Sequence, residues 1–441
     1  MATRIDQGFT DETIRVLQDY IRIDTTNPPG NEVEAAKYMR EILEREGINC
    51  RIEESGPGRA NLLATLRGKG EAKPVILLNH MDVVPAEESK WSVPPFSGVI
   101  KDGYVYGRGT IDMKGMAILE LMSLIYLKRH GISLNRDLIF LAVADEETGG
   151  EMGAKWVLEH HPELRDVEGV INEGGGGVIH GTRRWYEVST CQKVICQVKI
   201  TTKGEGGHAS VPRKTSAVTT LVEVLDRLRR HTFPYELNQT VKEFFHRVAP
   251  LQKDTWQPVF EDIEWAIESK APALKEVMEE PNYYSMTHNT AAITVLQAGE
   301  RVNVIPTEAM ARVDCRLIPG TSPDDFLKTI KEIVDNPEVE VQATFKGVDT
   351  PPTPHNTPLF HAIEQAIQDH DPGSIITPHL VAGATDSRYF RAAGVDCYDF
   401  IPFRLPVEEQ MLIHGIDERI SIENMTFGVE VMVDILINLG S

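Results

Sequence analysis

The stretch from Val75 to Pro85 reads V-I-L-L-N-H-M-D-V-V-P, and it decides the fold that we expect. Its first four residues form a short apolar run bounded by proline and polar residues, which is typical of a buried strand. His80 and Asp82 follow this strand directly. A second stretch, residues 138–150, reads L-I-F-L-A-V-A-D-E-E-T-G-G and again places polar, ionisable residues after a buried run.

Helix and strand patterns alternate around these two stretches. We predict helices at residues 13–23, 113–130 and 358–367, and strands at residues 61–66, 169–171 and 398–401. A further helix follows Asn31, which we expect to form a capping box with Glu34. Such alternation predicts an α/β fold with a mostly parallel, mixed sheet flanked by helices on both faces.

The pattern changes at Val194, where apolar and polar residues begin to alternate. From there the predicted elements run β-α-β-β-α-β, the order of a split βαβ unit. We therefore expect an inserted α+β, ferredoxin-like domain at residues 193–348, and a discontinuous domain made of residues 1–192 and 349–441. Within the insertion, the aromatic side chains of residues 231–288 are expected to pack rather than to shape a pocket.

Composition narrows the classes of function. The chain has 441 residues, enough for two or three domains, and a formal charge of −21. This negative charge repels phosphate backbones and anionic lipids, so neither nucleic acid nor membrane is an expected partner. The five scattered cysteines form no C-x-x-C pair, and the first ten residues contain no apolar run. We therefore expect reduced thiols, no secretory signal and a cytoplasmic location.

Ionisable side chains recur where the predicted strands end. His80, Glu146, Glu147 and Glu173 all come after such strands, where doubly wound sheets bind ligands. Asp82 is placed to orient the imidazole of His80. Asp112 comes just before a predicted helix, and its position by itself indicates the N-cap of that helix. Histidine and carboxylates are suitable zinc ligands, and two neighbouring zinc ions form a hydrolytic pair. From the residues alone, ordinary loop or capping roles stay open, and His414 is one candidate among several histidines.

The motifs, taken in order, resemble the co-catalytic two-zinc peptidase family that includes aminoacylase, glutamate carboxypeptidase G, yeast carboxypeptidase S, dipeptidases and succinyl-diaminopimelate desuccinylase. The resemblance spans essentially the whole chain. Its motifs are H-M-D-V-V-P (80–85), W-S-V-P-P-F-S-G (91–98), G-R-G-T-I-D-M-K-G (107–115), D-E-E-T-G-G (145–150), N-E-G-G (172–175), G-G-H-A-S-V-P (206–212), N-V-I-P (303–306), D-C-R-L-I-P-G (314–320), G-A-T-D-S-R-Y (383–389) and H-G-I-D-E-R (414–419).

The resemblance implies a role for each matching residue. One zinc would be held by His80, Asp112 and Glu173, and the other by Asp112, Glu147 and His414, with Asp112 bridging; Co²⁺ or Mn²⁺ are possible substitutes for Zn²⁺. Glu146 matches the general base, with Asp82 as a second catalytic residue. His208 matches a lid histidine that acts on the oxyanion, often from the other subunit of a homodimer formed through the lid. Substrate contacts are implied for Arg316, which would bind a carboxylate, and for Asn303, Thr385, Gly383 and Ala384; Arg388 is expected to brace its loop.

These roles imply a zinc-dependent enzyme that hydrolyses the amide bond of N-acyl-L-amino acids with a metal-bridging hydroxide and a glutamate base. Two alternatives stay open. One is a carboxypeptidase or dipeptidase that cleaves short peptides with a free carboxylate. The other is an inactive relative that binds amino-acid derivatives or serves as a scaffold. A serine hydrolase or single-zinc protease fits poorly, because the sequence lacks G-x-S-x-G and H-E-x-x-H motifs.

Overall fold

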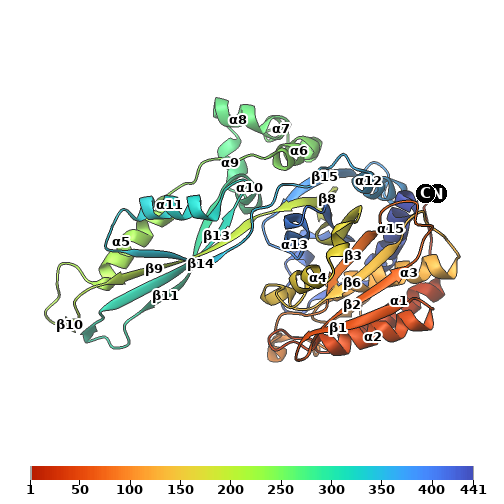
Figure 1. Cartoon of the computed structure of the whole chain (residues 1–441). Coiled ribbons are helices and arrows are strands. Elements are labelled where there is room, and N and C mark those ends of the chain that lie inside the picture. The colour runs from red at the N-terminus through yellow and green to blue at the C-terminus, as the bar shows by residue number, and fades with distance from the viewer. Residues whose placement is uncertain (1, 441) are drawn as a thin grey trace.

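Eight strands form the large sheet of the computed structural model, which describes residues 2–440 (Figure 1). Their order is β1-β2-β6-β3-β7-β16-β8-β15. The strands are β1 (Cys50–Gly56), β2 (Arg59–Leu66), β3 (Val75–His80), β6 (Leu138–Val143), β7 (Gly169–His180), β8 (Arg183–Gln192), β15 (Ile375–Val381) and β16 (Cys397–Pro406). The four strands β6, β3, β7 and β16 run parallel to one another. The pairings β1–β2, β2–β6 and β16–β8 are antiparallel, and β15 is parallel to β8. The predicted mixed α/β sheet is therefore confirmed.

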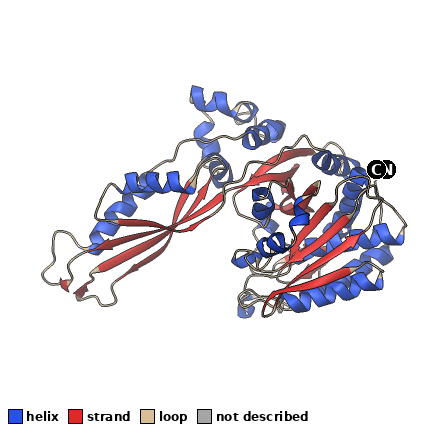
Figure 2. Ribbon diagram, in the orientation of Figure 1, coloured by secondary structure: helices blue, strands red, loops and turns tan. Residues whose placement is uncertain are grey.

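Helices cover both faces of this sheet (Figure 2). Val75 and Leu77 of β3 belong to one core and the alternate residues Ile76 and Leu78 to another, as expected for side chains on opposite faces of a strand. The first core contains α1 (Gln7–Ile21), α2 (Glu32–Arg45), α3 (Lys114–Arg129), α12 (Pro358–His370) and α15 (Ile422–Gly440). The second contains α4 (Ala154–His160) and residues of α13 (Ser387–Ala392).

Several local predictions differ from the structure. Helix α1 begins at Gln7, because Asp6 caps it by accepting a hydrogen bond from the backbone amide of Phe9. The predicted capping box at Asn31 is wrong, since the Asn31 side chain instead donates to the backbone carbonyl of Asp24. The strand predicted at residues 169–171 continues to His180, where pairing with β16 and β8 holds a glycine-rich segment extended.

A smaller lobe projects from the sheet body (Figure 1). Its antiparallel sheet has the order β11-β13-β9-β14, and its elements follow the predicted β-α-β-β-α-β order. They are β9 (Val194–Lys203), α5 (Ala217–Arg230), β11 (Thr290–Ala298), β13 (Glu308–Leu317), α11 (Pro323–Val334) and β14 (Glu340–Lys346). The short strands β10 (Gly207–His208) and β12 (Val304–Ile305) pair with each other, and β10 lies at the far tip of this lobe. We call these elements the lid lobe.

Residues 231–288 form helices that pack away from the lid lobe's sheet. These are α6 (Gln239–Val248), α7 (Gln257–Glu261), α8 (Ile263–Ser269), α9 (Leu274–Met278) and α10 (Pro281–Thr287). They share a core with Trp185 and Cys191 of β8 and Leu380 of β15, at the edge of the large sheet. Their aromatic side chains pack into that core, as predicted, but Phe244, Trp256 and Tyr283 also line a cavity, so the expectation that they shape no pocket is wrong. The domain boundaries at residues 192–193 and 348–349 stay a prediction.

The remaining elements are short. A three-stranded sheet contains β4 (Ile100–Lys101), β5 (Tyr104–Tyr106) and β17 (Arg419–Ser421), and the helix α14 (Val407–Gln410) follows β16. Across residues 2–440, all five cysteines are free, and four of them are buried. In the same part of the chain, we find no helix with the length and apolar character needed to cross a lipid bilayer.

Candidate metal centre

Three neighbouring strands, β6, β3 and β7, bring the ionisable residues to one place. His80 is the last residue of β3, and Glu173 lies in the adjacent strand β7. Glu146 and Glu147 form the turn that follows β6, where Asp145 adopts a left-handed backbone conformation with φ of 71°. Because the strands are parallel, the carboxyl ends of β3 and β6 meet at one edge of the sheet, as the sequence predicted. Glu173 reaches the same edge because it lies just beyond the part of β7 that pairs with β3.

Asp112 and His414 reach this edge from loops. Asp112 is not the N-cap of α3, which corrects the simple interpretation of its position: the helix begins at Lys114, and its N-cap is Met113. The Asp112 side chain is therefore available to contact the two histidines. His414 lies in the turns between α14 and β17, and half of its side chain is exposed.

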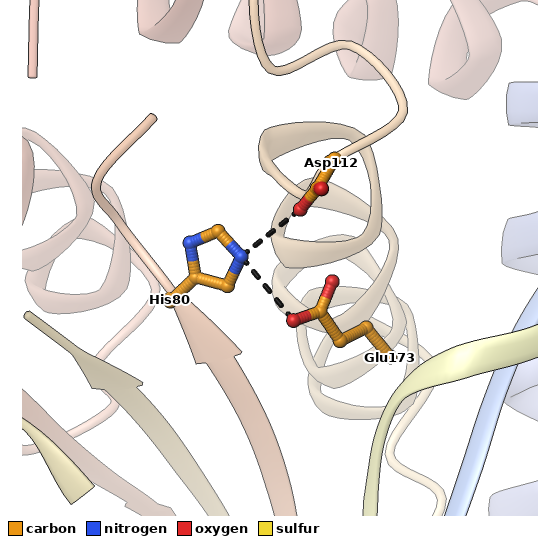
Figure 3. A group of neighbouring side chains, drawn as sticks. All are labelled: His80, Asp112 and Glu173. Carbon is orange, nitrogen blue, oxygen red and sulfur yellow. Dashed lines mark hydrogen bonds and ion pairs between the residues drawn. The ribbon is translucent and has the colours of Figure 1, made fainter. Parts of the chain in front are cut away.

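Two groups of three side chains meet at Asp112. In the first, Nε2 of His80 lies 3.1 Å from Oδ1 of Asp112 and 3.3 Å from Oε1 of Glu173, as Figure 3 shows. In the second, Nε2 of His414 lies 3.1 Å from Oδ2 of Asp112 and 3.3 Å from Oε2 of Glu147. In each group the potential ligand atoms lie within 4.8 Å of one another. Asp112 thus offers one oxygen to each group.

The centre contains several buried carboxylates close together, an arrangement that bound cations would stabilise. The carboxylates of Asp112, Glu146, Glu147 and Glu173 are each no more than 16% exposed. Burial, together with the charge of Asp112, raises the pKa of Glu173 to about 8. Burial also raises the pKa of Glu147, and its Oε1 is buried without a hydrogen-bond partner. Neighbouring buried carboxylates are stabilised when they coordinate a metal, so the donor set fits divalent cations that accept nitrogen and oxygen ligands.

This arrangement also raises the pKa values of the two histidines. Hydrogen bonds to Asp112 and Glu147 raise the pKa of His414 to about 10. Burial alone would lower the pKa of His80, but Glu173 and Asp112 raise it well above its usual range. The same carboxylates that stabilise the protonated imidazoles would stabilise bound cations, because a metal ion takes the place of the proton on the nitrogen that it binds.

Asp82 acts differently from the sequence-based expectation. The nearest acceptor for Nδ1 of His80 is the backbone carbonyl of Asp82, at 2.9 Å, whereas the Asp82 carboxylate is 3.5 Å away. That carboxylate accepts hydrogen bonds from the backbone amides of Glu146 and Glu147 and from the side chain of Asn27. Asp82 therefore positions both His80 and the acidic turn.

Glu146 lies beside a guanidinium rather than in either group of three. Nη1 of Arg388 is 3.5 Å from its Oε1, and Arg388 also donates to the backbone carbonyls of Gly149 and Thr385. Burial, with the nearby carboxylates of Asp386 and Glu173, raises the pKa of Glu146 well above its usual range. A carboxylate with a raised pKa is suited to accept and return a proton near neutral pH. Arg388 also braces the loop, as predicted.

A pocket of about 350 Å³ opens onto the centre. Gly383, Ala384 and Thr385, which the sequence predicted as substrate contacts, line it together with the acidic residues and His414. Thr385 donates to the side-chain oxygen of Gln192 through its backbone amide and its hydroxyl. These residues are therefore brought together with the centre.

Three other predicted site residues lie elsewhere. His208 in β10 and Asn303 beside β12 are exposed at the tip of the lid lobe, where the backbone carbonyl of Asn303 accepts a hydrogen bond from Ala209. Arg316 lies in β13, where its Nε donates to Asp314 at 2.7 Å. None of the three lines the pocket.

Glu418 is a residue whose role the sequence did not reveal, although it lies in the H-G-I-D-E-R motif. It is fully buried and pairs with Arg108 at 2.7 Å. It also accepts hydrogen bonds from the backbone amides of Gly109, Ile111 and Asp112. Glu418 thus holds the loop that presents Asp112. The sequence also did not reveal the role of the buried Asn27, whose side chain donates a hydrogen bond to Asp82.

Glu418→Ala is expected to lower the free energy of unfolding by about 3–5 kcal/mol, because it leaves Arg108 and the loop amides buried without a partner. Urea denaturation measures this loss. Glu423→Ala is the matched control, since that side chain is 83% exposed and should change stability by no more than about 0.5 kcal/mol. Equal effects of the two substitutions would contradict the anchoring role.

Comparison with known proteins agrees with this geometry. The model of "Peptidase family M20/M25/M40" matches residues 76–438. The chain is 28% identical to the N-fatty-acyl-amino acid synthase/hydrolase PM20D1 of Xenopus tropicalis, over 99% of this chain and 88% of that protein. It is 27% identical to human aminoacylase-1, with 97% and 95% of the two chains covered.

A solved structure supports the fold in particular. The M20 family metallo-carboxypeptidase Sso-CP2 from Sulfolobus solfataricus superposes with a TM-score of 0.76 at 20% identity, over 98% of this chain and 99% of that one. The family model covers well over half of the residues described here and includes all five side chains of the centre. The chain therefore belongs to peptidase family M20/M25/M40 and is a metal-dependent hydrolase of amide or peptide bonds.

Proposed function

We propose that this protein hydrolyses the amide bond of N-acyl-L-amino acids at a pair of divalent metal ions. The observation that carries the proposal is the convergence of five nitrogen- and oxygen-bearing side chains into two groups that share Asp112. His80 and Glu173 would complete the site of one ion, and Glu147 and His414 that of the other. Zinc suits this donor set, and cobalt or manganese are the expected substitutes.

When bound, the two cations would polarise the substrate carbonyl and acidify a water molecule. Glu146 would take the proton from that water and give it to the leaving amine. Its raised pKa supports this shuttling role, because a group that returns the proton must hold it for part of the cycle. Arg388 would keep the Glu146 carboxylate aimed at the pocket.

The main chain and side chains of the loop from Gly383 to Thr385 line the pocket and would contact the substrate beside the reacting carbonyl. Gln192 would hold Thr385 in place through its two hydrogen bonds. The Asp82 carboxylate would keep the backbone of Glu146 and Glu147 fixed while the proton moves.

His208 and Asn303 would complete the site from the lid lobe. Both are exposed at its tip, so their own centre is out of reach in this arrangement. A second copy of the chain, associated through the lid lobe, would bring its own tip residues to the pocket. We therefore propose a homodimer in which His208 stabilises the oxyanion of the neighbouring subunit. The cytoplasmic location stays a prediction.

Arg316 lies outside the pocket in this structure, so the lid lobe would have to approach the centre for Arg316 to bind the substrate carboxylate. With that contact, Arg316→Ala is expected to lower kcat/KM for N-acetyl amino acids by about 10- to 100-fold, because a guanidinium–carboxylate contact is worth about 1.5–3 kcal/mol. Amidated analogues, which lack the carboxylate, should change by no more than about twofold. Arg312→Ala on the same strand is the control, since its side chain is exposed. Steady-state kinetics on both substrate forms decide this; equal losses on acid and amide would assign Arg316 another role.

The substrate class itself is tested by a screen of the zinc-loaded protein. N-acetyl amino acids should be hydrolysed faster than dipeptides with the same C-terminal residue. Faster cleavage of the dipeptides would favour a carboxypeptidase or dipeptidase. Absence of turnover on the dipeptides and on N-acyl amino acids of every chain length would indicate an inactive relative that binds amino-acid derivatives.

A further inference from the structure

A second and larger cavity, of about 790 Å³, lies next to the pocket of the metal centre. It is formed between the edge strand β15, its neighbour β8 and the helices of residues 239–287. Gly174, Val178, Glu187 and Gln410 line both cavities. The two spaces are therefore neighbours with a common wall.

The walls of the larger cavity are mainly apolar and aromatic. Trp185 of β8 and Leu380 of β15 contribute from the sheet. The helical side contributes Phe244, Leu251, Trp256, Tyr283 and Met286. These side chains belong to one hydrophobic core, so the cavity has packed walls rather than a loose surface.

The two cationic side chains that line this cavity, Arg183 and Lys253, already have partners. Arg183 donates to the backbone carbonyl of Leu251 and to the side chains of Gln252 and His180. Lys253 pairs with Glu276 at 2.6 Å.

At the shared wall, Glu187 accepts a hydrogen bond from the indole of Trp185 and lies 3.6 Å from His379. Because the carboxylates of Glu187 and Glu280 also line the cavity and its two cations have partners, the cavity favours an uncharged chain over one that ends in a carboxylate.

We propose that this cavity binds the acyl chain of a medium- or long-chain N-acyl amino acid while the amide lies at the metal centre. This inference rests on the proposed function and specifies its substrate class. A short acyl group would leave the cavity unused, whereas each added methylene would remove apolar surface from water along its walls. The helices of residues 239–287 therefore determine the specificity of the protein for the length of the acyl group.

A chain-length series tests the proposal. N-acetyl, N-octanoyl and N-dodecanoyl forms of one amino acid are compared on the zinc-loaded protein, with the amino acid that is hydrolysed fastest as its N-acetyl derivative. Burial of methylenes is expected to raise kcat/KM by about a hundredfold or more from acetyl to dodecanoyl. A flat or falling series would overturn the inference and leave the proposed function intact; lack of hydrolysis of every member would overturn the proposed function itself.

Substitution at Leu251 tests whether the acyl chain of the substrate binds in this cavity. Leu251 lines the larger cavity and not the pocket of the centre. Leu251→Trp fills that space, so kcat/KM for the dodecanoyl substrate should fall by about tenfold or more. The value for the acetyl substrate should stay within about twofold, since the centre is untouched. Leu251→Phe adds less volume and should give a smaller loss.

Ile100→Trp is the matched control, because it adds the same side chain at a position that is 44% exposed and lines neither cavity. Melting temperatures of the variants establish that they fold. Equal losses on acetyl and dodecanoyl substrates in folded Leu251→Trp or Leu251→Phe would contradict binding of the chain in this cavity.

Discussion

Glu146→Gln is expected to lower kcat by about 10²- to 10⁴-fold, the contribution typical of general acid–base catalysis. The amide is almost the same size as the carboxylate but has no site that accepts and returns a proton at neutral pH. KM and the number of bound metal ions should change little, because Glu146 belongs to neither group of candidate ligands. Steady-state kinetics and elemental analysis measure these quantities.

Glu151→Gln provides the control for this substitution. Glu151 is close in sequence, is 62% exposed and pairs with Lys155 outside the pocket. Its replacement should leave kcat within about twofold. A Glu146→Gln protein that hydrolysed substrate as fast as the parent would refute the assignment of Glu146 as the base.

Asp112→Asn is expected to abolish measurable hydrolysis, because it disrupts both halves of the centre at once. Asp112 places one oxygen at 3.1 Å from His80 and the other at 3.1 Å from His414. The asparagine amide keeps one oxygen but presents an NH₂ group, which donates hydrogen bonds and does not coordinate a cation, in place of the other. Binding of at least one ion should weaken strongly, and activity should fall to background.

The control for Asp112→Asn is Asp102→Asn. Asp102 is exposed in a turn with φ of 52°, a conformation that asparagine also adopts readily. Kinetics together with metal titration by calorimetry separate the two proteins. Unchanged metal binding in Asp112→Asn would mean that this carboxylate does not bridge two ions.

The sequence predicted elements that carry their own signal. Continuous apolar runs identified β3 and β6, and the alternation after Val194 identified β9 and the order of the lid lobe. Strands β1, β8 and β15 were missed, since their segments mix charged, polar and apolar residues and become strands by pairing at or next to the edges of the large sheet. The backbone hydrogen bonds of neighbours, rather than local pattern, fix these strands.

The candidate site divides in a similar way. Residues within motifs, such as His80 and Glu173, were predicted because each follows an apolar run that the local sequence itself identifies as a strand. The anchoring of Asp112 by Glu418 joins residues more than 300 positions apart and exists only in the folded chain. The larger cavity is likewise absent from any motif, because β8, β15 and the helices of residues 239–287 form it together.

The most direct test of the account counts metal ions per chain in the parent and in two single variants. The parent should bind two ions, one for each group of side chains. Glu173→Gln and Glu147→Gln should each retain one tightly bound ion, since each removes a ligand from a different group. A parent protein that binds a single ion, or a second ion that persists unchanged in both variants, would contradict the paired centre.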